Sequence, residues 1–277
     1  MVGCAAEPSP DPPLGPTKGT FDALTYNVAA LPDGLSSAGA PAAERMPQIA
    51  ALLEDFAIIG LQEDFVAEYH ALLVDTSHET EEWFDAVKLT DPPPVMGSGL
   101  SMLARDVEVV DYFEQHYTSC YGLLDGSSDC LASKGFQMLR IRLGGEELDL
   151  YNTHHEAGGG DADNAAREAQ VQEVIDSITD RSGGRAVLFM GDTNLRWSDP
   201  DDVAALQLYA ETGLLDACDL VDCPETDHID RFLMRDSDTL SITATHWWRD
   251  ERFIDADSED LSDHPAIATT LDWAVRR

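Results

Sequence analysis

The sequence predicts an α/β fold in which two β-sheets pack together and helices cover the outside. Roughly ten segments have the apolar content or the polar–apolar alternation that is typical of strands. Helical segments separate several of these strands, while other strands follow one another through short hairpin links. The chain has 277 residues, 43% of them hydrophobic, which is enough to bury such a core in one domain over residues 20–277.

In the first half of the domain, strands and helices are expected in turn. Residues 21–27 alternate polar and apolar side chains as a half-buried strand does, and residues 57–63 read as a second strand. Residues 42–55 are expected to form a helix because large apolar side chains recur every three or four positions. A second helix is expected over residues 65–73. Four strands should follow, over residues 98–105, 107–113, 136–143 and 148–154.

The second half begins with a helix between residues 158 and 183 and continues with a buried apolar strand over residues 186–190. A further helix is expected within residues 198–213. Pro200 suits its first turn, and Gly213 suits its end. Three strands should complete the chain, over residues 228–235, 239–248 and 265–273.

The charge of the chain is strongly one-sided. It has 17 Lys and Arg residues against 53 Asp and Glu residues, a formal net charge of −36. Such a surface repels nucleic acid at long range, and no basic stripe interleaved with aromatic residues interrupts it, so no nucleic-acid-binding patch is expected. A solubilising or salt-adapted surface explains the charge, and an acidic interaction face is the alternative.

Four of the five cysteines form two close pairs. Cys120 and Cys130 bracket one loop-like segment, and Cys218 and Cys223 bracket another. Neither spacing is typical of a zinc site, so two local disulfides are predicted, and with them an oxidising, extracytoplasmic compartment.

The fifth cysteine, Cys4, stands among small residues before a Pro-rich acidic stretch. This pattern resembles the start of a mature bacterial lipoprotein, which would make Cys4 a lipidation site and a membrane tether. The alternative is an unpaired thiol in a tail. In both interpretations residues 1–19 are a tether outside the fold, and the protein is expected to be secreted or anchored at the cell envelope.

Polar side chains that can bind a metal or move a proton stand at the ends of six predicted strands. One alone is explained by ordinary turn chemistry, because Gly, Asp and Asn are common loop residues. Six together point to a site. The residues are Asn27, Glu63, Asn152 with His154, Asp192 with Asn194, Asp230, and Asp263 with His264.

The order of these motifs resembles the endonuclease/exonuclease/phosphatase superfamily, also called DNase I-like. The resemblance covers about residues 21–272 and implies a four-layer α/β sandwich with an active site along one edge of the sheets. It also implies metal-dependent hydrolysis of a phosphoester by in-line attack of an activated water. The motifs stand here as TYN, LQE, NTH, GDTN, HIDRF and SDH.

The chemistry of phosphodiester hydrolysis agrees with the first part of this set. Glu63 is a hard oxygen ligand suited to Mg²⁺, with Mn²⁺ or another divalent cation as alternatives. Asn27 and Asp263 would complete or support the metal site. His264 is expected to take a proton from the attacking water, and Asp230 resembles the carboxylate that orients the histidine in the family.

The remaining polar residues would position the phosphoryl group. Asp192 and Asn194 are expected to hold the water and the phosphoryl oxygens. His154 would donate a hydrogen bond or a proton where negative charge develops. Strand alternation places His154 on the face of Asn152, a candidate substrate contact, and His155 on the opposite face.

Three segments favour a phospholipid substrate over a nucleic acid. The sequence around Lys134 resembles the Lys-Gly-Phe segment of bacterial neutral sphingomyelinases, which makes Lys134 a candidate phosphate contact; a surface lysine in a turn is the alternative. TYNVAALP resembles a motif of lipid-cleaving members. HWWRDERF, with Trp247 and Trp248, falls where those enzymes carry an aromatic membrane-touching hairpin, although core packing also explains both rings.

A sphingomyelinase or phospholipase C-like phosphodiesterase acting as a monomer is therefore the expected function. The alternatives are an extracellular nuclease, another phosphoesterase, and an inactive binding relative. The sequence departs from the family pattern at Arg231, which replaces a common Tyr, and in SDHPAI, which is one residue shorter than usual. Neither departure removes a catalytic group.

Overall fold

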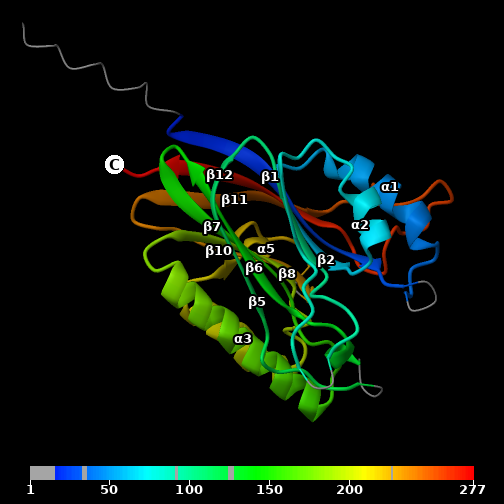
Figure 1. The fold of residues 1–277 in the computed structure, drawn as a ribbon. Helices are drawn as coiled ribbons and strands as arrows, with labels where there is room; N and C mark the ends of the chain where they lie inside the picture. Colours follow the sequence, from blue (N-terminus) through cyan, green and yellow to red (C-terminus); the bar gives the residue numbers. More distant parts are fainter. Residues whose placement is uncertain (1–15, 33–35, 91–92, 124–127, 226) are drawn as a thin grey trace, which may run out of the picture.

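Two six-stranded β-sheets pack face to face, with helices on both outer sides (Figure 1). The computed structural model describes residues 16–32, 36–90, 93–123, 128–225 and 227–277, so Cys4 and the predicted lipidation lie outside the described residues. The strand order is β11-β12-β1-β2-β4-β3 in the first sheet and β5-β6-β7-β8-β10-β9 in the second. This arrangement confirms the predicted four-layer α/β sandwich.

The first sheet contains both ends of the described chain. Its strands are β1 (Lys18–Ala30), β2 (Ile58–Asp64), β3 (Thr80–Phe84), β4 (Leu100–Ala104), β11 (Leu240–Arg249) and β12 (Ile267–Val275). Its helices are α1 (Ala42–Leu53) and α2 (Ala67–Leu73). Lys18 already pairs with Ala274 of β12, so β1 begins two residues before the predicted domain boundary at residue 20.

The second sheet carries the longer helices. Its strands are β5 (Glu108–His116), β6 (Gly135–Leu143), β7 (Glu146–His154), β8 (Ala186–Asp192), β9 (Leu215–Asp216) and β10 (Asp230–Arg235). Its helices are α3 (Asp161–Arg181), α4 (Pro200–Glu211) and the short α5 (Ala217–Leu220), with a 3-10 turn at Asp129–Leu131. The Asp199 side chain caps α4 by accepting a hydrogen bond from the Asp201 amide.

Three apolar layers hold the sandwich together. The inner faces of the two sheets form the central layer, where Leu150 of β7, Leu188 of β8 and Ile58 of β2 are fully buried. A second layer lies between the first sheet and α1, and a third between the second sheet and the helices α3 and α4. No helix in the described part of the chain has the length and apolar character needed to cross a membrane.

Strand direction brings the polar strand ends to one edge. β1 and β2 are parallel, so their carboxyl ends lie at one edge of the first sheet. β7 and β8 are also parallel, so their carboxyl ends lie at one edge of the second sheet. β10 runs antiparallel to β8 and begins with Asp230 opposite Asp192. β12 runs antiparallel to β1 and begins at Ile267, so Asp263 and His264 precede it at that same edge.

The two predicted disulfides are both present. The Cys120 and Cys130 Cα atoms are 5.3 Å apart, and those of Cys218 and Cys223 are 5.0 Å apart. The first closes the loop between β5 and β6, and the second closes the loop after β9. Both therefore stabilise connections rather than the sheets themselves.

Candidate active site

Asn27 joins the two sheets at the edge where the strands end. Its Nδ2 donates to Glu63 Oε1 at 3.1 Å and to Asp192 Oδ2 at 3.2 Å. Its Oδ1 accepts the Ala29 amide at 3.1 Å. Asn27 is fully buried and holds two carboxylates in place, one from each sheet. Its side chain therefore supports the site.

His264 and Asp230 form a pair beside Asp192. His264 Nδ1 is 3.0 Å from Asp230 Oδ2, which leaves Nε2 directed toward Asp192 Oδ2 at 3.7 Å. Burial alone would lower the pKa of His264, but the hydrogen bond to Asp230 and the charges of Asp230 and Asp192 raise it to about 10. Burial and the neighbouring Asp230 raise the pKa of Asp192. The pair has the orientation predicted for a histidine held by a carboxylate.

His154 lies on the other side of Asp192. Its Nε2 is 3.5 Å from Asp192 Oδ2 and accepts a hydrogen bond from Lys134 Nζ at 3.0 Å. Burial, with the positive charge of Lys134, holds the pKa of His154 well below its usual range. His154 is therefore a neutral imidazole facing the centre of the site, next to a buried cation.

His155 points away from this centre, as strand alternation predicted. Its Nε2 lies 2.6 Å from the Tyr209 hydroxyl under α4, and burial lowers the pKa of His155 to about 3. Its backbone carbonyl nevertheless supports the site, because it accepts Lys134 Nζ at 2.8 Å and Asn194 Nδ2 at 3.2 Å.

Backbone strain gathers around the same edge. Three residues other than glycine have positive φ there: Ala29 at 48°, Glu63 at 59° and Asn194 at 50°. Such conformations cost of order 1–3 kcal/mol each and persist where the surrounding structure imposes them. The Asn194 amide also donates to Asp192 Oδ1 at 3.0 Å, which fixes the turn after β8.

Two predicted site residues lie outside the buried centre of the site. Asn152 is fully buried between the sheets and donates to the Leu61 and Ser101 carbonyls at 3.0 and 3.1 Å, while its Oδ1 accepts Gln62 Nε2 at 2.7 Å. Asn152 therefore crosslinks the two sheets and is not the substrate contact that we expected. Asp263 is exposed and accepts the Ser37 hydroxyl, beside the site rather than within its buried centre.

Sequence reasoning missed the supporting role of two residues at this edge. Asp129 pairs with Lys134 Nζ at 2.6 Å; an acidic residue five positions before one of the three lysines was the available signal. Arg231 is fully buried, with Nη1 2.8 Å from Asp216 Oδ2 and Nη2 2.9 Å from the Leu195 carbonyl. It thus ties the start of β10 to the turn after β8.

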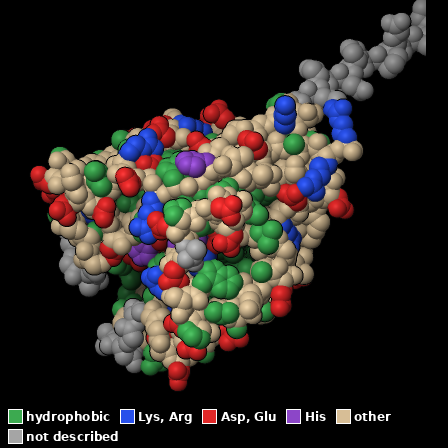
Figure 2. All heavy atoms as spheres, turned by 180° about the vertical axis from the view of Figure 1, so that it is seen from behind, with side chains coloured by type: hydrophobic (Ala, Val, Ile, Leu, Met, Phe, Trp, Pro, Cys, Tyr) green, Lys and Arg blue, Asp and Glu red, His purple; other side chains and the backbone are tan. Residues whose placement is uncertain are grey.

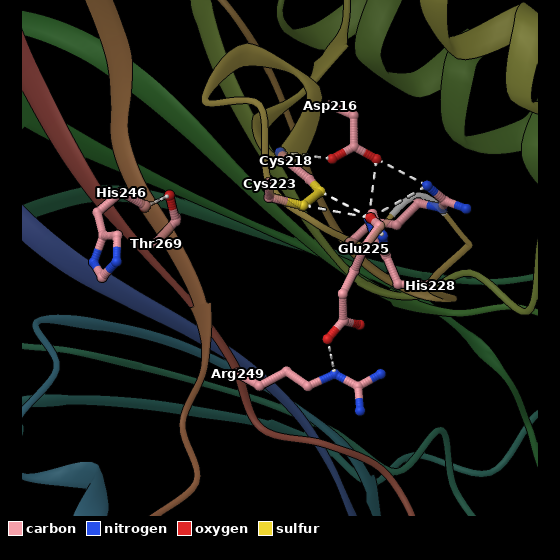
Figure 3. The surroundings of a disulfide bond; sticks show 9 residues. Asp216, Cys218, Cys223, Glu225, His228, His246, Arg249 and Thr269 are labelled. Atoms are coloured by element: carbon pink, nitrogen blue, oxygen red, sulfur yellow. Dashed lines mark hydrogen bonds and ion pairs between the residues drawn. A yellow bond between two sulfur atoms is a disulfide. The ribbon is translucent and has the colours of Figure 1, made fainter.

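Asp216 belongs to a second polar cluster, behind the first. His228 Nε2 lies 3.2 Å from Asp216 Oδ2, and Figure 3 shows the two side chains meeting beside the Cys218–Cys223 disulfide. Asp216, Cys218 and His228 have metal-binding atoms close together, but the sulfur of Cys218 is already bonded to Cys223. The cluster therefore supports the loop before Asp230.

The oxygen atoms of the main cluster fit a hard divalent cation. Glu63 is half-buried, and burial raises the pKa of its carboxyl group, so ionising it is costly unless positive charge lies nearby. Ligand atoms of Asp192, Asp230 and His264 also lie within 4.8 Å of one another. Carboxylate-rich sets without thiolates are typical of Mg²⁺ and Mn²⁺ sites.

Comparison with known proteins places this geometry in a family. Residues 100–217 match the endonuclease/exonuclease/phosphatase family 2. A sphingomyelinase of Mycobacterium bovis is 31% identical over 279 residues, which span 92% of this chain and 53% of that protein. The chain belongs to the endonuclease/exonuclease/phosphatase superfamily. It spans about half the length of the curated relative it matches.

Solved structures of other proteins share the fold. A mutant of Staphylococcus aureus beta toxin with bound magnesium ions superposes with a TM-score of 0.68 at 15% identity, covering 91% of this chain and 99% of the toxin. D. rerio TDP2, complexed with a single-strand DNA product, gives a TM-score of 0.67 at 18% identity, covering 91% and 98%. The beta toxin and the DNA-bound TDP2 are therefore about equally similar to this chain in fold, and the fold alone does not select a substrate.

Proposed function

We propose that this protein is a metal-dependent phosphodiesterase that hydrolyses the headgroup ester of a phospholipid, with sphingomyelin as the substrate. The observation that carries the proposal is the meeting of Glu63, Asp192 and the Asp230–His264 pair at one edge, connected through Asn27. These side chains come from separate strands of both sheets and meet in one reaction centre. If each side chain only formed a local turn, they would not need to meet.

A divalent cation would be held by Glu63, with Asp192 beside it and Asp263 at the rim. When bound, it would neutralise phosphate charge and polarise a phosphoryl oxygen. Asn27 donates a hydrogen bond to both the Glu63 and the Asp192 carboxylate, and so fixes their separation and orientation. The fit rests on these oxygen atoms, whose chemistry is that of Mg²⁺ or Mn²⁺ sites.

The chain's own residues supply proton transfer and positioning. Asp230 holds His264 through Nδ1, so Nε2 is the atom that receives a proton from the attacking water. His264 loses its proton more readily beside a divalent cation, because like charges repel. On the opposite side, His154 and Lys134 face the position where negative charge grows on the phosphoryl oxygens or on the leaving group.

The lipid assignment rests on three supports. The relative that matches over 92% of this chain is a sphingomyelinase. The net charge of −36 repels a nucleic acid, whereas a zwitterionic headgroup escapes that repulsion. Lys134, in the segment similar to the Lys-Gly-Phe of sphingomyelinases, lies in direct contact with His154 and so places a positive charge, paired with Asp129, beside the reaction centre. The disulfides agree with action outside the cytoplasm.

Turnover of four substrates tests this function: sphingomyelin, phosphatidylcholine, duplex DNA and bis(p-nitrophenyl) phosphate, each with Mg²⁺ and with EDTA. We expect choline phosphate release from sphingomyelin to exceed DNA nicking, and EDTA to abolish every activity. Glu63→Gln should weaken Mg²⁺ binding, measured by calorimetry, at least about tenfold and should lower turnover by about 10² or more.

The exposed Glu211 supplies the matched control, because Glu211→Gln removes the same charge far from the site. It should leave turnover and Mg²⁺ binding unchanged. Efficient DNA cleavage with untouched lipids would replace the lipid assignment with a nuclease, and full activity after exhaustive chelation would refute the metal.

A further inference from the structure

Exposed apolar side chains gather on two segments next to the active site. Ten large hydrophobic residues are exposed in the described part of the chain, and five of them lie within residues 87–95 and 121–123. Leu89 is 100% exposed and Val95 is 71% exposed. We call these five the apolar rim: Val87, Leu89, Val95, Tyr121 and Leu123.

Main-chain and side-chain contacts hold both segments against residues 130–133. The Cys130 amide donates to the Gly122 carbonyl at 3.0 Å. The Val95 amide donates to the Leu131 carbonyl at 2.9 Å, and the Lys88 amide donates to Ser133 Oγ at 2.9 Å. Met96 and Ala132 form an isolated β-bridge. The rim is therefore part of a built surface.

A cavity of about 250 Å³ lies between these segments. Its wall is largely apolar and includes Pro94, Leu123, Ala132 and the Cys120–Cys130 disulfide. Its largely apolar wall suits a short length of hydrocarbon chain. The disulfide stabilises one wall of the cavity.

Two of the three lysines in the chain line this cavity. Lys134 connects it to the reaction centre through its contact with His154. Lys88 Nζ donates to the Tyr117 carbonyl at 2.6 Å and forms no ion pair with a described carboxylate. Lys134 is paired with Asp129, so Lys88 is the lysine of this cavity without a described carboxylate partner. An apolar cavity with such a cation, in a protein of charge −36, matches a molecule that joins a hydrocarbon chain to a phosphate.

Trp247 and Trp248, the candidate membrane-contacting residues, pack against the protein itself. Trp247 is 6% exposed and packs between the sheets, while Trp248 is partly buried against the layer that contains Phe56. The other exposed hydrophobic residues are distributed over separate elements, such as Leu72 on α2 and Leu215 on β9. Ile254 lines a pocket with Asp263 and His264, but it is a single exposed side chain. Among the described residues, the apolar rim is the larger exposed apolar group near the active site.

We propose that the apolar rim and its cavity form the lipid-docking surface of this protein. The rim enters the acyl-chain region of a zwitterionic bilayer, a hydrocarbon chain occupies the cavity, and Lys88 contacts lipid phosphate at the interface. The headgroup is thereby directed toward Lys134 and His154. This last step rests on the proposed function, whereas membrane docking itself does not.

The test uses the full chain with Cys4→Ser, so that no lipid group on Cys4 contributes to binding. Vesicles of sphingomyelin and phosphatidylcholine are mixed with this parent and with the double variant Leu89→Ser/Val95→Ser, and binding is measured by flotation. Two exposed apolar side chains leave the interface, so the dissociation constant should rise at least about tenfold. Vesicle hydrolysis should fall in parallel, while hydrolysis of soluble bis(p-nitrophenyl) phosphate should stay within about twofold.

Leu215→Ser/Leu220→Ser is the matched control, because both residues are exposed but lie on β9 and α5. It should bind vesicles as the parent does. Unchanged flotation of the rim variant, equal loss in the control, or a parent that does not bind vesicles would each overturn the docking surface. If neither lipid nor soluble ester is hydrolysed, the proposed function fails, yet flotation still decides the docking surface.

Discussion

At the residue scale, His264 and Asp192 each have one polar atom in a fixed contact and another directed at the centre. His264 is held at Nδ1 by Asp230 and presents Nε2 to Asp192. Asp192 is held at Oδ1 by the Asn194 amide and presents Oδ2 to both histidines. Such preorganisation is what lets polar groups stabilise developing charge without first rearranging.

The adjacent histidines His154 and His155 should have separable effects. His154→Ala removes a group at the centre, so turnover should fall about 10²- to 10⁴-fold. His155→Ala deletes a buried ring and its contact with Tyr209, so the free energy of unfolding should fall by about 2 kcal/mol or more. Turnover per folded molecule should then change less than about tenfold.

Urea unfolding and single-substrate kinetics on both variants measure these effects. The comparison is internally controlled, because the two substitutions remove the same side chain from consecutive positions on one strand. An essential His155 with a dispensable His154 would show that the strand-face assignment does not describe the chemistry.

At the scale of elements, the site depends on strand ends that come close together. β8 passes next to β7, and Gly191 lies where a Cβ atom would be 2.2 Å from the Thr153 carbonyl oxygen. Its φ of 145° is also one that side chains rarely adopt. Glycine before Asp192 therefore lets the parallel strands approach while their ends deliver His154 and Asp192 as neighbours.

Gly191→Ala should distort this approach. The added methyl group meets backbone, which cannot move without disturbing the sheet, so we expect a loss of about 2 kcal/mol or more in the free energy of unfolding. Turnover should fall as well, because β8 carries Asp192. Gly39→Ala is the control: nothing lies within 4 Å of its added Cβ, and stability should stay within about 0.5 kcal/mol. Equal stability of the two variants would contradict the close-approach argument.

At the scale of the whole molecule, the acidic surface shapes behaviour in solution. Acidic side chains are scattered over the face seen in Figure 2, and a histidine side chain shows in a hollow of that face. A net charge of −36 on 30.2 kDa produces self-repulsion that opposes the folded state. Screening by salt reduces this repulsion between exposed charges.

The melting temperature should therefore rise by several degrees between about 0.01 and 0.5 M NaCl, equivalent to on the order of 1–2 kcal/mol. Differential scanning calorimetry measures it. Tetramethylammonium chloride should give a similar rise, because screening depends on ionic strength and not on the identity of the cation. No rise, or a rise with Mg²⁺ alone, would show that a specific site rather than surface repulsion controls stability.

Sequence reasoning predicted most elements and missed those with a weak local signal. β3 reads TEEWF, an edge strand with two acidic residues, and β9 has only two residues, so neither shows the pattern of a buried strand. Asn152 was misplaced for a different reason. The strand pattern put it on the same face as His154. Only the tertiary structure shows that its amide group donates to the Leu61 and Ser101 carbonyls of the facing sheet.

The sequence by itself determined the layered α/β architecture, the superfamily and the residue types of the site, because apolar periodicity and motif order are local properties of the chain. Only the tertiary structure decided which polar atoms meet. Asn27 contacts Asp192 across 165 positions, and Lys134 reaches His154 across the pairing of β6 with β7. The structure also decided that Trp247 and Trp248 pack against the protein while the apolar rim faces solvent. Contacts between distant segments depend on strand order and sheet packing, and neither is written in the spacing of neighbouring residues.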